Sequence, residues 1–392
     1  MITSTKIEQK QLNLNQIEYT YRKGIKMLNF KSRLKKKFFN IFLQNQKIGI
    51  FNSLKCEKFI KEYFFKISFF FYPNNQIQSW VFFWIINSFD LIRKSINPVI
   101  LKNFKKKIQN LLFRCGQKGK LFLNSSNLIS LYTLTLSFFS LSVKFSNIKK
   151  FYILKIYSFL KKILRSKNFI RCSFIGESDP RSVFCILVIS SLFNILTKNL
   201  FKKMIFEINQ INSFDGGFSC DKSRESHGAL SFCLLGSCIF FSTKNYSLKV
   251  FSNFKIWFLE KLKYFDSGIQ GRPNKIIDSC YIFWLGASSI VLSINIPFEL
   301  LNVLFFCFKL EFKGFCDQIG KAPDLYHTFY SISGLSLLSF VFHKKKKIYD
   351  TNTSCSKFFQ KYGLQSKINP IYGIRERKIF HLFQLQKETK KI

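Results

Sequence analysis

Glycine, proline and acidic residues are scarce in this chain. Only 17 of the 392 residues are glycine and 7 are proline, which excludes collagen-like proteins and chains dominated by flexible linkers. Asp and Glu together number 21 against 62 Lys and Arg, so the formal net charge is +41. Because turn-forming residues are few and no alternation of apolar and polar positions is sustained, an all-β fold is disfavoured.

Apolar residues, by contrast, are abundant. They make up 47% of the chain, and phenylalanine alone contributes 51 residues, which excludes intrinsic disorder for most of the sequence. Phenylalanine and lysine are over-used along the whole chain, a pattern typical of drift in an AT-rich genome. No arginine-rich arm, zinc-finger spacing or aromatic strand motif accompanies the positive charge, so we expect no nucleic-acid partner.

Cysteine usage and the apolar runs bear on the cellular setting. The 11 cysteines are an odd number, are widely scattered and form no C-x-x-C pair, which favours a reducing compartment. We expect the cytoplasm, with organelle-associated cytosol as an open alternative. Two uncharged stretches, Leu121–Val143 and Ser279–Phe298, reach membrane-spanning length, but we interpret them as buried helices and expect no transmembrane segment.

The chain divides into an extension and one helical domain. Residues 1–53 are polar and basic without a sustained period, so we expect an N-terminal extension there and a single domain over residues 54–392. In the domain, apolar segments of helical length alternate with short polar breaks, which predicts an all-α fold. The predicted helices cover Gln78–Ile92, Val183–Leu196, Ser226–Phe241, Tyr281–Ile296 and Leu325–Phe342.

An internal repeat organises the second half of the domain. Three segments share a glycine turn, a polar loop and an apolar helix, and their turn glycines Gly217, Gly268 and Gly314 lie 51 and 46 residues apart. This spacing fits one helical hairpin per repeat. Asp278 and Asp324 each follow the turn glycine of their repeat by ten residues. Stacked repeats place equivalent loops on one face, so these polar loops are predicted to converge.

A candidate metal site lies in those loops. Asp278, Cys280 and His327 offer a carboxylate, a thiolate and an imidazole, and zinc accepts all three kinds of donor. The spacing alone leaves an alternative open. In that alternative Asp278 caps a helix, Cys280 is a small core residue and His327 is a buried histidine with a hydrogen-bond partner.

A candidate anion site lies in the same loops. His227, Arg272, Lys275 and Tyr281 fall in a loop or in the first turn of the next helix, where donors suit a phosphate group. The alternative is ordinary surface charge. The sequence contains no G-x-x-x-x-G-K-[ST] phosphate-binding loop.

Four large aromatic residues come from distant repeats. Trp80, Trp84, Trp284 and Tyr330 either pack the core or line an apolar cavity that suits a long hydrocarbon ligand. Periodicity alone does not separate these two interpretations.

Six stretches of the sequence resemble the β subunits of protein prenyltransferases. The two most specific are GRPNKIIDSCYIFW, from Gly271 to Trp284, and DQIGKAPDLYHTFYSISGLS, from Asp317 to Ser336. The other four are residues 79–84, 176–182, 225–228 and 369–374. The resemblance covers about residues 54–385. It implies an α/α toroid (α-α barrel) of repeated helical hairpins, in which inner and outer helices alternate around a central funnel.

The resemblance also implies a chemistry. The family transfers an isoprenoid from its diphosphate to the cysteine thiol of a C-terminal CaaX motif, and an α subunit supplies a further lysine, so this chain is expected to be active only in a heterodimer. By resemblance Asp278, Cys280 and His327 hold zinc, and Asp317 binds Mg²⁺ with the diphosphate. The catalytic donors to the diphosphate are then His227, Arg272, Lys275 and Tyr281. The substrate-binding residues are Trp80, Trp84, Arg181, Trp284, Tyr326 and Tyr330.

Three positions favour the farnesyl lipid. By resemblance, Trp80 fills the floor of the funnel, Tyr330 follows the zinc histidine by three residues, and Asp317 is the farnesyltransferase-type magnesium ligand. Residues 271–275 and 225–228 look more like geranylgeranyl relatives. The sequence therefore predicts a zinc-dependent protein farnesyltransferase β subunit. The alternatives are the type I or, less favoured, the type II geranylgeranyltransferase, and a non-enzymatic scaffold that binds an α subunit.

Overall fold

The computed structural model describes most of the domain predicted from the sequence. The described residues are 56–63, 75–94, 96–114, 127–141, 148, 150–164, 170–172, 181–198, 204, 213–220, 224–240, 248–263, 268–294, 296, 308–309, 314–318, 321–345 and 366–388. The predicted boundary between an extension and the domain, after residue 53, lies outside them and stays a prediction.

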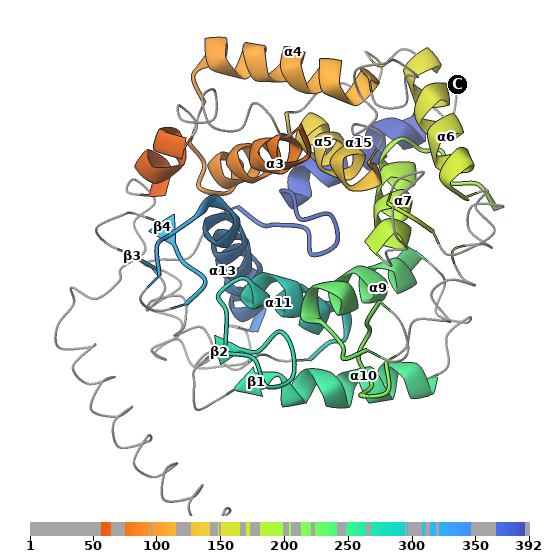
Figure 1. Cartoon of the computed structure of the whole chain (residues 1–392). Helices are drawn as coiled ribbons and strands as arrows, with labels where there is room; N and C mark the ends of the chain where they lie inside the picture. The colour runs from red at the N-terminus through yellow and green to blue at the C-terminus, as the bar shows by residue number, and fades with distance from the viewer. Residues whose placement is uncertain are drawn as a thin grey trace, which may run out of the picture.

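Six helices of the described chain form a closed inner circle. They are α3 (Asn75–Leu91), α5 (Leu128–Ser140), α7 (Arg181–Leu192), α9 (Gly228–Phe240), α11 (Tyr281–Val291) and α13 (Leu325–Lys345). Each packs against the next, and α13 packs against α3 (Figure 1). The helices α4 (Pro98–Arg114), α6 (Lys150–Leu164) and α10 (Leu248–Glu260) lie outside this circle (Figure 1). The predicted α/α toroid is therefore confirmed.

The inner helices are apolar on most faces because they are covered on two sides. In α5, the polar side chains inside the helix turn back on its own backbone: the Thr135 hydroxyl donates to the Leu131 carbonyl at 2.7 Å, and the Ser137 hydroxyl to the Thr133 carbonyl at 2.8 Å. Asn127 begins α5 by accepting the Ile129 N–H at 2.8 Å. Hydroxyls satisfied in this way allow a helix of mixed Ser, Thr and apolar residues to be buried.

The two long uncharged stretches of the sequence contain short buried helices. The first contains α5, with 13 residues, and the second contains α11, with 11 residues. Within the part of the chain that the structure describes, no helix combines the length and the apolar character needed to cross a membrane.

Two small hairpins precede the loops of the last two repeats. β1 (Leu262–Lys263) pairs antiparallel with β2 (Gly268–Ile269), and β3 (Phe308–Lys309) pairs antiparallel with β4 (Gly314–Phe315). The expectation that Gly268 and Gly314 form turns was therefore wrong, since each begins a strand. At Gly314 the Phe59 ring lies 2.8 Å from where a Cβ would stand, so close packing also accounts for this glycine.

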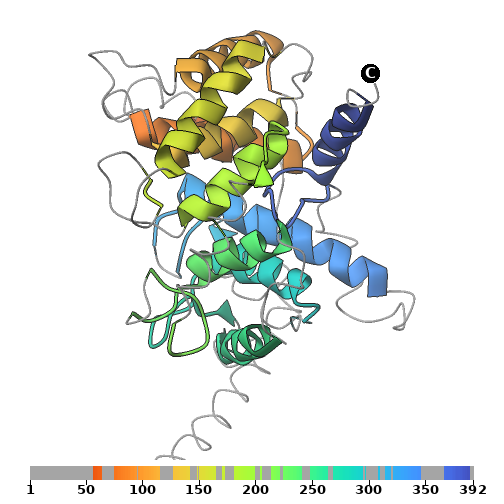
Figure 2. The same cartoon turned by 90° about the vertical axis from the view of Figure 1, so that its right-hand side faces the viewer.

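The C-terminal segment ties the ends of α3 and α7 to the middle of α13. The Ser336 hydroxyl of α13 donates to the Ser366 carbonyl at 2.5 Å, and the Arg93 Nε, just past α3, donates to the Ser366 hydroxyl at 3.3 Å. Farther on, α15 (Glu376–Glu388) contributes Gln386, whose amide donates to the Leu192 carbonyl at the end of α7, at 2.7 Å. Figure 2 shows α15 running beside the barrel.

Candidate metal and anion site

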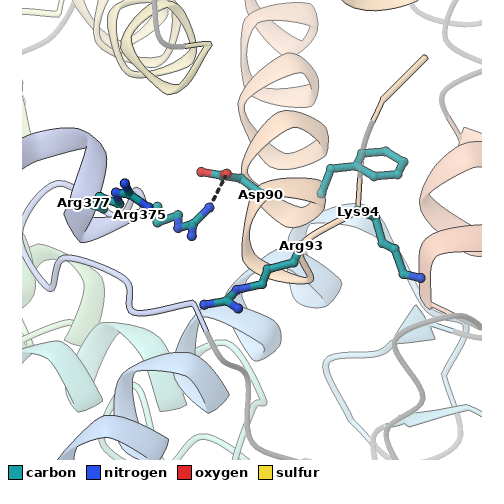
Figure 3. Close-up of a pocket in the computed structure, with 6 residues that line it drawn as sticks. Asp90, Arg93, Lys94, Arg375 and Arg377 are labelled. Carbon is teal, nitrogen blue, oxygen red and sulfur yellow. Dashed lines mark hydrogen bonds and ion pairs between the residues drawn. The ribbon is translucent and has the colours of Figure 1, made fainter. Parts of the chain in front are cut away.

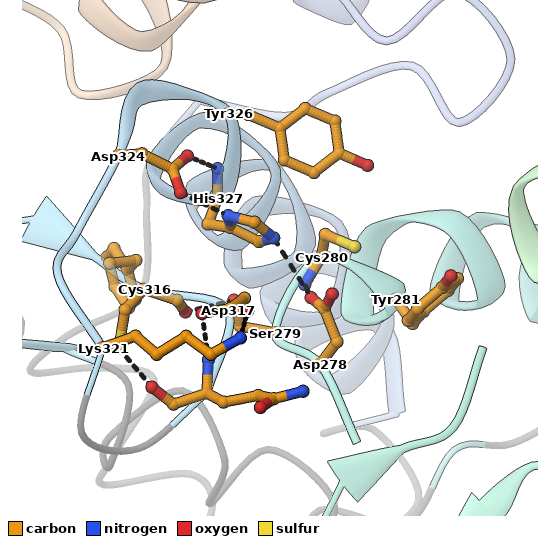
Figure 4. A network of polar contacts seen from close by, with 12 residues as sticks. Asp278, Ser279, Cys280, Tyr281, Cys316, Asp317, Lys321, Asp324, Tyr326 and His327 are labelled. Atoms are coloured by element: carbon orange, nitrogen blue, oxygen red, sulfur yellow. Dashed lines mark hydrogen bonds and ion pairs between the residues drawn. The ribbon is translucent and has the colours of Figure 1, made fainter. Parts of the chain in front are cut away.

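Three potential metal ligands meet between α11 and α13. Asp278 and Cys280 stand in the loop that leads into α11, and His327 lies in the first turn of α13 (Figure 4). One ligand atom from each residue lies within 4.8 Å of the others, and Cys280 is buried. Within the described chain this is the one group of three or more His, Cys, Asp and Glu side chains that meets such a criterion. Zinc would bind such oxygen, sulfur and nitrogen atoms at about 2.0–2.3 Å.

The loops that carry these residues are joined to each other. The Ser279 N–H donates to the Asp317 carbonyl at 3.0 Å, and the Ser279 hydroxyl donates to the buried Cys316 carbonyl at 2.7 Å. Equivalent loops of successive repeats are thus hydrogen-bonded side by side, which is the convergence that the repeat predicted.

Asp324 orients the imidazole of His327. Its Oδ2 lies 2.6 Å from His327 Nδ1, and its Oδ1 accepts the His327 backbone N–H at 2.8 Å, so it also caps α13. With Nδ1 engaged, Nε2 is the nitrogen that faces the other ligands, and it lies 3.5 Å from Asp278 Oδ1. A carboxylate behind a metal-ligating histidine fixes the tautomer and ring orientation in many metal sites.

The electrostatics of the group fit a cation. Burial opposes the charged imidazole, but the carboxylates of Asp278 and Asp324 outweigh it and raise the pKa of His327 to about 9. Burial likewise opposes the charged form of Asp278, yet hydrogen bonds from His327 and Cys280 lower the pKa of that carboxyl. Burial raises the pKa of the Cys280 thiol well above its usual range, so a nearby cation is needed to hold the thiolate. Donor types, positions and charge together fit zinc.

A histidine and a tyrosine form a second, adjacent cluster. His227 Nε2 lies 3.3 Å from the Tyr281 hydroxyl, which comes from the first residue of α11. The other ring nitrogen of His227, Nδ1, accepts the Ala229 N–H at 3.1 Å. A neutral His227 therefore carries its proton on Nε2, the nitrogen that faces Tyr281.

At neutral pH, His227 and Tyr281 each keep a proton that can be donated in a hydrogen bond. Burial, followed by the positive charges of Arg272 and Arg181, lowers the pKa of His227 to about 4, so the ring is neutral at pH 7. Burial, followed by the neighbouring Cys280, raises the pKa of the Tyr281 hydroxyl. With the His227 N–H directed at the Tyr281 oxygen, the Tyr281 O–H is the donor that the pair offers to an anion without a change of protonation.

Two glycines make room for the Tyr281 ring. A Cβ at Gly271 would lie 1.8 Å from the Tyr281 Cζ, and a Cβ at Gly228 would lie 2.9 Å from its Cδ1. The Gly228 N–H also donates to the Gly271 carbonyl at 2.8 Å, which joins the two backbones behind the ring. The position of Tyr281 therefore depends on both glycines.

The remaining predicted cations lie at the exposed edge of this cluster. Arg272 is partly exposed, and its Nη1 lies 3.9 Å from Glu225 Oε1. Lys275 is exposed on the same loop, and Arg181 is exposed at the start of α7. Arg181 and Arg272 both act on the charge state of His227.

Aromatic side chains form a closed circle of contacts around the inner helices. All four aromatic residues singled out from the sequence belong to it, together with Tyr326, Tyr132, Phe184 and Phe232. The ring centroids follow one another as Trp80–Tyr132 (6.4 Å), Tyr132–Phe184 (6.0 Å), Phe184–Phe232 (5.5 Å), Phe232–Trp284 (5.1 Å), Trp284–Tyr330 (4.4 Å), Tyr330–Tyr326 (4.7 Å), Tyr326–Trp84 (5.6 Å) and Trp84–Trp80 (5.7 Å). Each inner helix contributes at least one ring.

Asp317 already has a cationic partner. Its Oδ2 lies 2.6 Å from the Lys321 Nζ, and its Oδ1 accepts the Gln318 N–H at 2.8 Å (Figure 4). This carboxylate raises the pKa of the Lys321 amine. A metal ion at Asp317 would therefore compete with an ammonium group for the same oxygen.

Four functional candidates were missed in the sequence. Asp324 and Lys321 act on His327 and Asp317, while Tyr132 and Phe232 complete the aromatic circle. The repeat gave a signal for Asp324, which occupies the position of Asp278 one repeat later. The other three gave none, since lysine and phenylalanine occur throughout this chain.

Comparison with known proteins gives one family. The model of the prenyltransferase alpha-alpha toroid domain matches residues 51–374. The protein farnesyltransferase subunit beta of Schizosaccharomyces pombe is 28% identical over 203 residues, which cover 47% of this chain and 52% of the relative. The geranylgeranyl transferase type-1 subunit beta of Arabidopsis thaliana is 30% identical over 177 residues, covering 42% and 46%. The chain thus spans about half the length of the curated relatives it matches.

A solved structure matches over most of its length. The Candida albicans protein geranylgeranyltransferase-I complexed with GGPP superposes with a TM-score of 0.68 at 19% identity, covering 85% of this chain and 98% of that one. At this identity the match supports the fold. Both curated relatives are β subunits of protein prenyltransferases, in agreement with the resemblance of the sequence motifs.

Proposed function

This chain belongs to the prenyltransferase alpha-alpha toroid family, and from that premise we propose that it is the catalytic β subunit of a zinc-dependent protein farnesyltransferase. The observation that carries the proposal is the meeting of Asp278, Cys280 and His327 within 4.8 Å, beside a cluster of donors suited to a diphosphate. The substrates of the proposed reaction are farnesyl diphosphate and the cysteine of a C-terminal CaaX motif.

Each of the three proposed metal ligands would supply a different kind of donor atom to zinc. Asp278, Cys280 and His327 would supply an oxygen, a sulfur and a nitrogen ligand, leaving one position open for a substrate thiol. Bound zinc would lower the pKa of that thiol, which favours the nucleophilic thiolate. Asp324 holds His327 in the tautomer that presents Nε2 to the metal.

The donor cluster would act on the leaving group. As the bond between the isoprenoid C1 and oxygen breaks, negative charge develops on the diphosphate. His227 and Tyr281 would donate hydrogen bonds to its oxygens, and Arg272 and Lys275 would neutralise part of its charge. Because His227 is neutral and Tyr281 protonated, neither has to change its charge as the reaction proceeds.

The aromatic circle would bind the hydrocarbon chain. Trp80, Trp84, Trp284, Tyr326 and Tyr330 supply flat apolar surface, and Trp284 Nε1 donates to the Tyr326 hydroxyl at 3.1 Å, which satisfies one polar group of the lining. The bulk of Trp80 supports the fifteen-carbon lipid, because an added isoprene unit would need the space that the indole fills. Arg181, at the mouth of the circle, belongs to the proposed substrate-binding set.

Magnesium and an α subunit are further parts of the proposal. Asp317 would bind Mg²⁺ together with diphosphate oxygens, an arrangement that Mg²⁺ adopts with one carboxylate and substrate phosphates. The α subunit would complete the active site, and free thiols in a cytoplasmic, reducing setting suit thiolate chemistry.

A competition assay tests the proposal. The chain is co-expressed with a candidate α subunit, and the complex is given zinc, magnesium, a CaaX peptide and both farnesyl and geranylgeranyl diphosphate. We expect mainly farnesylated peptide, and no product from Cys280→Ala, which removes a zinc ligand. The matched control is Cys233→Ala in α9, a buried cysteine outside the metal group. A Cys280→Ala protein that keeps zinc and full turnover would overturn the metal assignment.

The second candidate is the β subunit of a type I geranylgeranyltransferase. It is supported by the relative in Arabidopsis thaliana, which has a similar identity to this chain. Mainly geranylgeranylated peptide in the competition assay would select it. Transfer to a Rab protein without a CaaX motif would indicate the type II enzyme. A zinc-loaded heterodimer that forms no product would indicate a scaffold.

A further inference from the structure

Arginine is rare in this chain, yet three arginines meet in one cavity. Only 11 of the 62 basic residues are arginine. Arg93, Arg375 and Arg377 line a cavity of about 420 Å³ together with Phe89, Asp90 and Lys94 (Figure 3). Where lysine is the common basic residue, such a gathering is not explained by composition. Arginine differs from lysine in presenting a planar fork of donors that matches phosphate oxygens.

The cavity lies at the other end of the barrel from the metal group. Ser366 is bonded both to Arg93 and to Ser336, and Ser336 follows His327 by nine residues along α13. At 1.5 Å per residue this separation amounts to about 13–14 Å along the helix axis. The cavity is therefore distinct from the site between α11 and α13.

The backbone holds Arg93 at the cavity in an uncommon conformation. Its φ is +54°, in the left-handed region that few long side chains adopt. The inner helices α7 and α11 end in the same way, but there the position is held by Asn194 (φ 55°) and Ser293 (φ 56°). Of these three helix ends, that of α3 is the one with a long cationic side chain, Arg93, at the left-handed position.

Among the described residues that line the cavity, four are basic and one is acidic. Asp90 is its carboxylate, and it lies 3.4 Å from Arg375 Nη1 and 2.8 Å from Lys378 Nζ. Arg93 and Arg377 face the same space, and Arg377 is exposed. Lys94 extends to the other side of the α3 end, where it pairs with Glu57 at 3.5 Å.

We propose that this cavity binds a phosphate-bearing ligand of more than one phosphate group. Guanidinium forks bind phosphate oxygens in pairs, and three of them can contact different faces of one polyphosphate. The cavity is a broad depression largely open to solvent, so it can admit a ligand longer than a single phosphate. A soluble polyphosphate and the head group of a phosphorylated lipid present the same chemistry.

The test is a calorimetric titration of the full chain, in its heterodimer if one forms, with tripolyphosphate. All proteins carry Arg272→Gln, so that the donor cluster beside Tyr281 contributes little binding. We expect the additional double variant Arg93→Gln/Arg377→Gln to bind at least tenfold more weakly. Arg93→Lys/Arg377→Lys keeps the charge without the fork and should lose several-fold. The control, Lys161→Gln/Lys255→Gln, removes the same charge from α6 and α10 and should bind as before.

Further measurements control for loss of folding and identify the source of the ligand. Thermal unfolding monitors each variant, and Arg377→Gln alone, at an exposed position, should still weaken binding at least threefold if the double variant does not fold. Sedimentation with vesicles containing phosphatidylinositol bisphosphate, compared with phosphatidylserine, separates a lipid source from a soluble one. Unchanged binding in the arginine variants, or an equal loss in the lysine control, would overturn the proposal. Neither result depends on prenyl transfer.

Discussion

Asp324 holds His327 by two atoms at once. One carboxylate oxygen lies 2.6 Å from Nδ1 of the ring and the other accepts the backbone N–H of the same residue at 2.8 Å. Asp278 occupies the equivalent place one repeat earlier, but its Oδ1 accepts the N–H of Cys280 and lies 3.5 Å from Nε2 of His327. Two aspartates at the same repeat position are thus a candidate metal ligand and the support of another candidate ligand.

Replacing Asp324 with Asn should weaken zinc binding. Asparagine still caps α13. It lacks, however, the negative charge of Asp324, which holds the Nδ1–H of His327 and makes the ring a more basic ligand. We expect a zinc affinity about ten- to a hundredfold lower, the usual range for such a partner. Competition with a chromophoric chelator measures it. Equal affinity in the variant and the parent protein would show that Asp324 only caps the helix.

Gly271→Ala should displace Tyr281 and lower the transfer rate. The added Cβ would stand 1.8 Å from the tyrosine ring, so the ring must move. Loss of a preorganised donor costs about 10²–10³ in kcat, and we expect Gly271→Ala to approach Tyr281→Phe in single-turnover assays. Gly286→Ala in α11 is the matched control, since its Cβ meets its nearest neighbour at an ordinary 3.4 Å. Full activity in Gly271→Ala would remove Tyr281 from the donor set.

The charge state of His227 gives a pH test. Its pKa is lowered from 6.5 to about 4 by burial and by Arg272 and Arg181, so NMR of the ring should show a midpoint near pH 4. Arg272→Gln should move that midpoint upward, though not to 6.5, because burial is the larger cause. A midpoint of 6.5 in the parent protein would contradict this environment.

The same shift has a consequence for stability. The unfolded chain takes up a proton at His227 near pH 6.5, while the folded chain does so only near pH 4. Protonation between these values therefore favours unfolding, and the contribution of His227 to stability is lost as pH falls from about 6.5 to about 4. His227→Gln should flatten the dependence of the free energy of unfolding on pH in this window.

Sequence motifs located the candidate metal ligands because each ligand type is rare or fixed by the repeat. The chain has four histidines, and Asp278, Cys280 and His327 fall in loops that the repeat brings together. The repeat predicted stacked helical hairpins, and the resemblance implied that they close into an α/α toroid. The repeat does not predict the rotamers of the side chains. The bond from Asp324 to His327 Nδ1 depends on the orientation of one ring, which no spacing encodes.

The aromatic circle illustrates the other limit. In a chain with 51 phenylalanines, Phe232 carries no positional signal, although its ring lies 5.1 Å from that of Trp284. Likewise the turn assigned to Gly268 and Gly314 was wrong, since each begins a strand. At Gly314 the glycine is a small residue beneath the Phe59 ring, which is a tertiary requirement.

Trp80→Thr should admit a longer lipid. The indole packs against Trp84, Phe83 and Tyr132, so its removal opens space inside the aromatic circle. We expect the ratio of kcat/KM for geranylgeranyl over farnesyl diphosphate to rise at least tenfold, since each newly buried methylene contributes about 0.8 kcal/mol. Trp257→Thr in α10 is the control for a lost tryptophan, because Trp257 is fully buried outside the circle. An unchanged ratio in Trp80→Thr would contradict its role in setting lipid length.

Lys321 should set the magnesium requirement of the proposed reaction. Its ammonium occupies Asp317 Oδ2 at 2.6 Å, so Mg²⁺ must displace it before it can bind that oxygen. Lys321→Met removes the competitor, and we expect the Mg²⁺ concentration for half-maximal rate to fall by about two- to fivefold, the range set by a partly exposed ion pair. Steady-state rates over a magnesium titration, with the diphosphate saturating, measure the change.

Asp317→Asn separates competition from a general effect of charge. If the carboxylate is the magnesium ligand, Asp317→Asn removes the response to Mg²⁺, and Asp317→Asn/Lys321→Met behaves like the single asparagine variant, because the two side chains act through one contact. Lys161→Met, on α6, changes the net charge equally and should leave the titration where it was. An Asp317→Asn protein that keeps the parental magnesium dependence would place the ion on the diphosphate alone. In that case the ammonium of Lys321 serves only to hold the loop beside His327.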